Sequence, residues 1–214
     1  MLVWAMACVT VSIGAPLEAS AGKFDETLDL SLHTRAGSVG PVGVGLAGRG
    51  PAVLSDARLV GRALSLTPTF RINLSLSGWR FGVGAGYEGY TGLRLDHDPL
   101  PVGYAITDGR VGGIPVEGFV GYAMRSDKRI RPFVEARTTV TAVVARAQLH
   151  HRHDGDLGSV RMRAATFGVG GRMGVLLALN DYVFVDVGVG RVFHGPGGWT
   201  ASVGIGLPIP LSNL

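Results

Sequence analysis

The sequence predicts an all-β protein, an eight-stranded antiparallel up-and-down transmembrane β-barrel. Three observations carry this prediction. Apolar and polar residues alternate with a period of two along much of the chain, no amphipathic helix of useful length follows residue 22, and long and short connections alternate between the expected strands. Glycine is also abundant, with 34 of 214 residues, but without the strict triplet period of collagen.

The N-terminal segment has the pattern of a secretory signal peptide. It is apolar as far as Pro16, and Ala19-Ser20-Ala21 matches a small-residue cleavage site. We expect residues 1–21 to be removed, leaving residues 22–214 as one barrel domain. The only cysteine, Cys8, lies within the peptide, so the mature chain has no cysteine and no disulfide framework.

The clearest strand signal covers residues 64–76. Its even positions are apolar, from Leu64 to Leu76, and its odd positions are polar, from Ser65 to Ser75. An alternation of this length fits a tilted membrane strand better than a globular one. The same pattern places the eight strands at 24–35, 62–77, 79–91, 112–124, 132–147, 160–177, 182–193 and 199–211.

The connections predict which strand ends share a side of the membrane. Ser77-Gly78 reads as a two-residue hairpin turn, and Asn180-Asp181 centres another short turn. The connections at 36–61 and 92–111 are long and rich in Gly, Pro and Asp, and His150 to Ser159 forms a further connection on their side. Long loops outside and short turns inside are the layout of bacterial outer-membrane barrels.

Glycine recurs on one face of the strands. Residues 81–90 read FGVGAGYEGY, and Gly84 to Gly89 fit the G-x-G-x-x-G pattern of a dinucleotide turn. That turn requires a helix to begin at its last glycine, and the residues that follow Gly89 do not form one. We interpret the glycines instead as inward positions that make room for bulkier neighbours inside a narrow barrel.

Each strand has a Leu/Val face and a glycine face, and the face that points outward decides the class of barrel. A soluble, lipocalin-like binder would point its Leu/Val face inward around an apolar ligand, whereas a membrane barrel would point it outward into lipid. Sparse charges of both signs on the glycine face favour a membrane barrel with that face inward. Aromatic residues near the strand ends resemble two interfacial girdles. They are Trp79, Tyr122, Phe133 and Tyr182 at the turn end, and Tyr87, Tyr90, Phe193 and Trp199 at the loop end.

On these features the chain resembles the small outer-membrane β-barrels of the OmpA/OmpX-like type, over about residues 23–214. The resemblance implies a location in the outer membrane of a Gram-negative cell, with membrane lipid and lipopolysaccharide around the barrel. It further implies a structural or interaction role, with a possible extracellular partner at loops 36–61 and 92–111. The chain departs from the type at its end, where Leu214 replaces the usual aromatic residue.

The inward charges predict a network that fills the lumen. Buried charges require opposite partners, so a salt-bridge plug is the expected arrangement. A narrow path for ions or small solutes is the alternative. The expected members of the network are Arg71, Arg80, Glu88, Glu117, Glu135, Arg137, Arg172 and Asp186.

Two other chemistries have weaker signals. Ser31 and His33 share a face, but it is predicted to point inward, and their order reverses the H-x-S of the lipid A deacylases, which this barrel resembles in architecture. We therefore expect no catalytic residues and no lipid-modifying enzyme. The candidate metal ligands His150, His151, His153, Asp154 and Asp156 have no closed four-ligand spacing, which favours a solvated loop without metal or cofactor. The net charge of +4 is dispersed, so no nucleic-acid surface is expected.

Overall fold

The computed structural model describes residues 26–39, 44–45, 47–49, 58–60, 63–91, 94–96, 104–124, 129–195 and 198–214. The predicted signal peptide, residues 1–21, lies outside the described residues. In the described part of the chain, no helix is long and apolar enough to cross a membrane.

The barrel wall consists of eight strands in chain order, the third of which is interrupted at Tyr87. They are β1 (Glu26–Val39), β5 (Ala63–Leu76), β6 (Trp79–Gly86) continued by β7 (Glu88–Thr91), β9 (Tyr104–Ala123), β10 (Ile130–His151), β11 (Gly155–Asn180), β12 (Val183–His194) and β13 (Trp199–Pro210).

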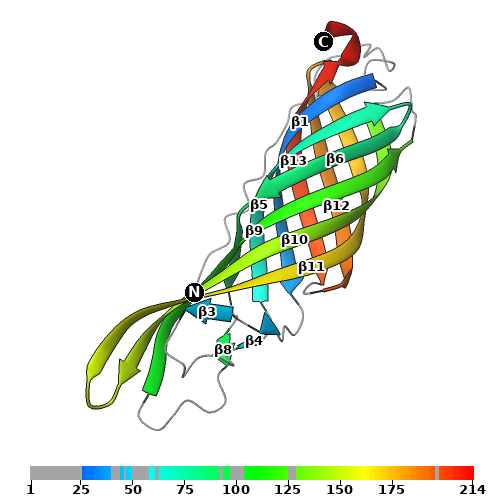
Figure 1. Ribbon diagram of the computed structural model, residues 1–214. Helices are drawn as coiled ribbons and strands as arrows, with labels where there is room; N and C mark the ends of the chain where they lie inside the picture. Colours follow the sequence, from blue (N-terminus) through cyan, green and yellow to red (C-terminus); the bar gives the residue numbers. More distant parts are fainter. Residues whose placement is uncertain are drawn as a thin grey trace.

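Every neighbouring pair in this wall is antiparallel, and the sheet closes on itself. The first strand, β1, pairs with β5 on one side and with the last strand, β13, on the other. Closure satisfies the backbone groups that an open sheet edge would leave without partners in lipid. The predicted eight-stranded antiparallel up-and-down barrel is therefore confirmed (Figure 1).

Short turns gather at the end of the barrel that also holds the start of β1 and the C-terminal 3-10 helix η3 (Leu211–Asn213) (Figure 1). Between β5 and β6 the turn is Ser77-Gly78, with φ angles of 49° and 92°. Two positive φ values define a type I′ hairpin turn, whose twist matches the flanking strands. The turn between β11 and β12 is also short, at Asp181-Tyr182.

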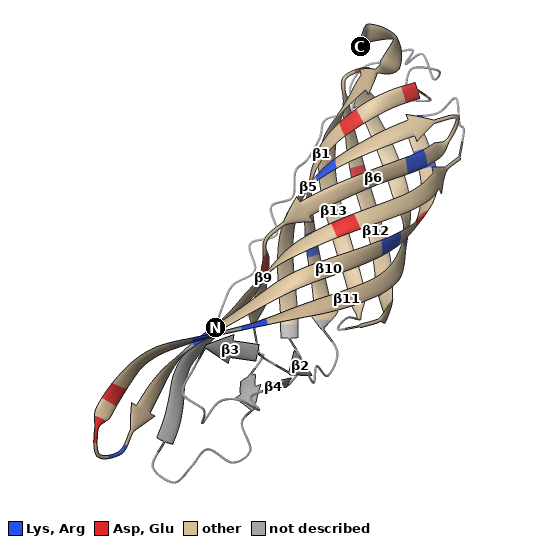
Figure 2. Ribbon diagram, viewed as in Figure 1, with Lys and Arg blue, Asp and Glu red and all other residues tan. Residues whose placement is uncertain are grey.

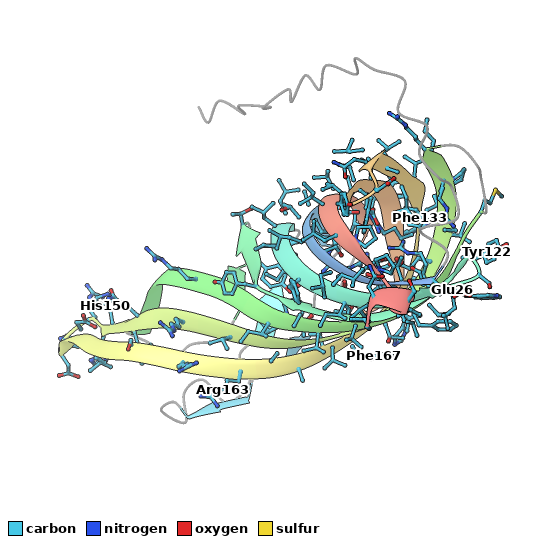
Figure 3. All side chains as sticks on the ribbon, turned by 90° about the horizontal axis from the view of Figure 1, so that it is seen from above. Glu26, Tyr122, Phe133, His150, Arg163 and Phe167 are labelled. Carbon is cyan, nitrogen blue, oxygen red and sulfur yellow. The ribbon has the colours of Figure 1, made fainter. Side chains whose placement is uncertain are left out.

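At the opposite end, three neighbouring strands run far past the barrel. The strands β9, β10 and β11 continue together as an extension, and His150 lies at its tip (Figures 1 and 3). The sequence predicts connections at 92–111 and 150–159, and this prediction is wrong for residues 104–111, 150–151 and 155–159, which lie in strands. The ladder between β10 and β11 reaches His151 opposite Gly155, because the ladder joins backbone groups, which polar residues carry as apolar ones do.

The two long connections contain short strands. In the first, β3 (Ala47–Arg49) pairs with β11, and β2 (Val44–Gly45) and β4 (Arg58–Val60) pair with each other. In the second, β8 (Arg94–Asp96) adds to β4. All the residues that the structure describes within the predicted loops 36–61 and 92–111 lie in strands, so the prediction of loops is wrong for these residues.

The exterior of the barrel is apolar and its interior is polar. Leu66, Val83, Val116 and Ile205 are more than half exposed, whereas every inward charge named from the sequence is buried. The predicted aromatic girdles are correct in part: Trp79, Tyr122 and Tyr182 face outward at the turn end, and Tyr87, Phe193 and Trp199 face outward at the loop end. Phe133 and Tyr90 do not, because each shares the inward parity of a buried acid two residues away.

Glycines on the inner face stand opposite large side chains. A Cβ added at Gly204 would lie 2.5 Å from His33 Nδ1, and one added at Gly84 would lie 3.0 Å from Arg71 Cγ. The contact at Gly204 is too close for a real Cβ, and the contact at Gly84 could form only if Arg71 shifted, so the glycines provide space that the inward side chains occupy. The string from Gly84 to Gly89 belongs to β6 and β7, and no helix follows it.

Candidate functional site

Seven alternating charges form a connected series of ion pairs across the lumen, which we call the charge chain. Its seven members lie on seven different strands, so it links almost the whole circumference of the barrel. Figure 2 shows the acidic and basic positions spread over the wall. In order of contact from the loop end to the turn end, the members are Arg35, Glu117, Arg71, Glu135, Arg172, Asp186 and Arg80.

The first half of this chain centres on Glu117. The Nε of Arg71 donates to Glu117 Oε1 over 2.5 Å, and Arg35 Nη1 donates to Glu117 Oε2 over 3.1 Å. The Nη1 of Arg71 also reaches Glu135 Oε1 at 3.3 Å. Each of these side chains is at most 10% exposed. Charge-assisted hydrogen bonds at this burial hold the groups far more firmly than surface pairs would.

The second half centres on Asp186, which is fully buried on β12. Arg172 contacts both carboxylate oxygens of Asp186 with two guanidinium nitrogens, in the bidentate geometry that suits arginine and carboxylate. Its Nη1 also lies 3.8 Å from Glu135 Oε2, which joins the two halves. Arg80 Nη1 ends the chain, 3.9 Å from Asp186 Oδ2.

Two phenylalanines pack against the arginines of this chain. The guanidinium carbon of Arg71 lies 4.7 Å from the ring centre of Phe119. Phe133 stands between Arg172 and Arg80, at 4.9 and 5.5 Å. Cation–π contacts of this kind add stabilisation where water is excluded. Both rings share the strand parity of the inward charges, and this parity is the signal that could have placed them in the lumen. The sequence pattern instead led to Phe133 as a member of the turn-end girdle, and Phe119 is not among the predicted site residues.

Six of the eight predicted network residues are therefore brought together, and two have other partners. Glu88 accepts a hydrogen bond from Tyr90 Oη over 2.8 Å. Arg137 Nη2 donates to Thr200 Oγ1 over 3.2 Å. Arg35, which is not among the predicted network residues, joins the network instead, because its guanidinium reaches Glu117.

A separate polar cluster surrounds Asp29 near the turn end. Its carboxylate accepts hydrogen bonds from Thr27, Asn73 and Ser75 over 2.6, 2.6 and 3.0 Å. Three donors satisfy this carboxylate without a directly bonded arginine. Hydrogen bonds to Asp29 therefore link β1 and β5 on the turn side of the charge chain, in addition to the ion pairs within the charge chain.

Two small cavities lie at the two ends of the charge chain. The cavity toward the loops, about 50 Å³, is lined by Arg35, Glu88 and Arg137 among others. The cavity toward the turns, about 30 Å³, is lined by Asp29 and Arg80 among others. Each has room for only a few water molecules. Between them the lumen is occupied by the side chains of the charge chain.

Ser31 and His33 do lie within hydrogen-bond distance, with 3.0 Å between His33 Nε2 and Ser31 Oγ. Both are buried inside the lumen, at 2% and 3% exposure. A lipid substrate in the membrane would meet the opposite face of β1. The pair therefore lacks the access that nucleophilic catalysis on a lipid requires.

The histidine-rich segment forms the tip of the extension. His151 Nδ1 lies 2.6 Å from Asp154 Oδ2, and the rings of His151 and His153 are 5.8 Å apart. Asp156 accepts a hydrogen bond from the Gly158 backbone N–H, and His150 is half-buried on β10. Within the described ranges, no three His, Cys, Asp or Glu side chains converge in a way that could hold a metal ion.

No protein-family model matches the chain, and no curated protein matches it either. Several solved structures are similar to the chain, among them the following two. Neisserial surface protein A (NspA) is 14% identical, with 86% of this chain and 97% of that chain covered and a TM-score of 0.49. The outer membrane protein OprG from Pseudomonas aeruginosa is 10% identical, with 88% of this chain and 99% of that chain covered and a TM-score of 0.51.

At such low identity the likeness to OprG establishes the fold and nothing more. The chain has the fold of a small eight-stranded outer-membrane β-barrel, in agreement at this coarse level with the OmpA/OmpX-like type.

Proposed function

We propose that this protein is a barrel in the outer membrane of a Gram-negative cell, and that the barrel does not conduct ions. Its lumen is plugged by the charge chain, and its role is structural or interactive, without enzymatic activity. The observation that supports the proposal is the unbroken alternation from Arg35 to Arg80, in which every carboxylate touches two arginines.

The electrostatics of the lumen favour a closed state. An ion passing through would have to separate pairs such as Arg71–Glu117, and separation leaves a buried charge without its partner. Eight strands also leave interior space mainly for side chains. A narrow ion path is the competing function, and the two cavities at the ends of the chain are where such a path would begin and end.

Conductance across a planar bilayer tests the plug. We expect the wild-type barrel to give no sustained open-channel current. The double variant Arg71→Ala/Glu117→Ala removes two adjacent members of the loop-side half of the charge chain and should give openings, because it frees the lumen between the loop-side cavity and Glu135. The control Arg152→Ala/Asp154→Ala removes one charge of each sign at the exposed extension tip and should stay closed. Stable, ion-selective current from the wild type would support the channel instead.

The extension is the part that we propose for contact with partners outside the cell. The extension has a buried apolar side on β10, since Ala145 at its base and Leu149 further along are each at most 3% exposed. The exposed tip at Arg152 and the short-turn side at Arg129 lie at opposite ends of β10. Trypsin added to intact cells should cut at the tip, and cut near Arg129 only after the outer membrane is permeabilised. The reverse pattern would place the extension in the periplasm.

A further inference from the structure

Three arginines stand side by side on the outer surface, outside the site described above. In the β9–β10–β11 ladders, Arg146 is directly opposite Arg110 on one side and directly opposite Arg161 on the other. All three are exposed. Directly opposed residues on neighbouring strands have their Cα atoms about 4.5–5.5 Å apart, so the guanidinium groups share one small area. We call this set the arginine row.

The arginine row lies where the apolar exterior ends. On β10, the outward positions from Val134 to Val144 carry no charge, and Arg146 is the next outward residue. Val134 is directly opposite Tyr122 of the turn-end girdle, so the apolar band is measured from this level. Ten residue steps at about 3.3 Å, on a strand tilted by about 40°, give a height of about 25 Å, which is that of the apolar band of a membrane barrel. The row therefore lies at the head-group level of the loop-side leaflet. Figure 2 shows basic positions where the strands leave the barrel.

A groove of about 410 Å³ adjoins the row. All three arginines line it, and its remaining lining includes Tyr87, Ile114 and other apolar or small residues on the membrane side. Arg163, the outward residue next to Arg161 on β11, adds a fourth positive charge beside it (Figure 3). The groove thus has a basic rim toward the loops and an apolar wall toward the lipid. This is the shape of a site for an amphiphile with an anionic head.

Like charges directly opposite each other destabilise a sheet, so an anion bound between the three guanidinium groups would relieve their repulsion. Among the residues that the structure describes, no carboxylate forms an ion pair with Arg110, Arg146 or Arg161. Arginine forks match phosphate oxygens in bidentate geometry. A lipid with a phosphate at the head-group level would pair its phosphate with the arginines and place its acyl chain against the apolar wall of the groove.

We propose that the arginine row binds the phosphate groups of a lipid A-type phosphorylated glycolipid in the outer leaflet. The proposal rests on the proposed location in the outer membrane and names the lipid that the barrel would hold there. The row fixes the head group at the junction between the barrel and the extension, and the groove takes the start of an acyl chain.

The test uses the full mature barrel, refolded in an uncharged maltoside detergent and titrated with lipid by native mass spectrometry. The probes are bis-phosphorylated lipid A, the same lipid without phosphates, and inorganic phosphate. The variants are Arg146→Ser, the triple variant Arg110→Ser/Arg146→Ser/Arg161→Ser, and the matched control Arg152→Ser, which removes one exposed charge at the extension tip.

We expect lipid A to bind the wild type at least about tenfold more tightly than the dephosphorylated lipid, since each charge-assisted contact contributes more than a neutral one. Arg146→Ser should weaken binding several-fold and the triple variant at least about tenfold, while Arg152→Ser binds like the wild type. Equal binding of the two lipids, or unchanged binding by the triple variant, would overturn the proposal. Inorganic phosphate binding as tightly as lipid A would overturn the assignment to a lipid.

The mobility of boiled and unboiled samples on a gel reports whether each variant is a folded barrel. If the wild-type protein shows the mobility shift but binds the two lipids equally, the result contradicts only the proposal for the arginine row. A wild-type protein that shows no shift and stays soluble counts against the membrane barrel itself.

Discussion

The lumen and the arginine row use the same side chain in opposite ways. Arg71 is buried and touches two carboxylates, those of Glu117 and Glu135. Arg146 is exposed and has another arginine directly opposite on each side. Both lie on strands with the same alternating pattern. Arg71 faces inward, where its direct cross-strand neighbours are the uncharged Ser31 and Gly84 and its carboxylate partners reach it across the lumen, whereas Arg146 faces outward between two arginines. The comparison shows that the face of the wall, and the charges within reach on that face, decide whether an arginine is paired inside the barrel or left exposed on its surface.

The largest effect should come from removing an acid of the lumen. Asp186→Ala leaves Arg172 and Arg80 without their shared carboxylate in a fully buried position. We expect the free energy of unfolding to fall by about 3–5 kcal/mol. Equilibrium urea unfolding in lipid vesicles, followed by tryptophan fluorescence, measures this. Asp154→Ala, at an exposed pair with His151, is the control and should change stability by less than about 1 kcal/mol.

An intermediate effect should come from the glycine face. Gly204→Ala places a Cβ against His33, whose ring is held by Ser31, and should destabilise the barrel by about 1–3 kcal/mol. The same change at Gly118, where the nearest neighbouring atom would be Thr138 Oγ1 at 3.7 Å, should be neutral or slightly stabilising. Equal costs at the two positions, in the same unfolding assay, would show that the inner glycines do not make room for side chains.

The smallest effect on stability should come from the arginine row. Arg146→Ser removes a charge that faces two like charges, so the free energy of unfolding in uncharged lipid should change by less than about 0.5 kcal/mol, toward greater stability. Arg71→Ser in the same vesicles should lower it by several kcal/mol. A loss at Arg146 as large as the loss at Arg71 would remove the distinction between the two regions.

The period of two predicted the barrel and the inward set, because a strand in a closed wall has only two faces. It did not predict the partners. Whether Arg35 or Arg137 reaches Glu117 depends on the stagger between strands, which a single sequence does not display. The same limit applies to the arginine row, which becomes visible only when the register aligns Arg110, Arg146 and Arg161.

Two errors could have been avoided from the sequence. Phe133 shares its parity with Glu135, and Tyr90 shares its parity with Glu88, so both rings had to face inward. We followed their nearness to strand ends instead of their parity. The extension is a different case. Its polar segments near His150 and Gly155 resemble a loop, because strands without an apolar face lack the alternation that marks the barrel wall.

The central claim is that the lumen charges act as bonded partners in a closed interior, and a double-mutant cycle on Arg71 and Glu117 tests it most directly. The two single variants, Arg71→Met and Glu117→Met, and the double variant are unfolded in the same lipid vesicles. We predict a coupling energy on the order of 1–3 kcal/mol, with the double variant more stable than the sum of the two single losses implies. Losses that add to within about 0.5 kcal/mol would contradict the plug, because they would mean that water separates the two groups in a lumen that is open.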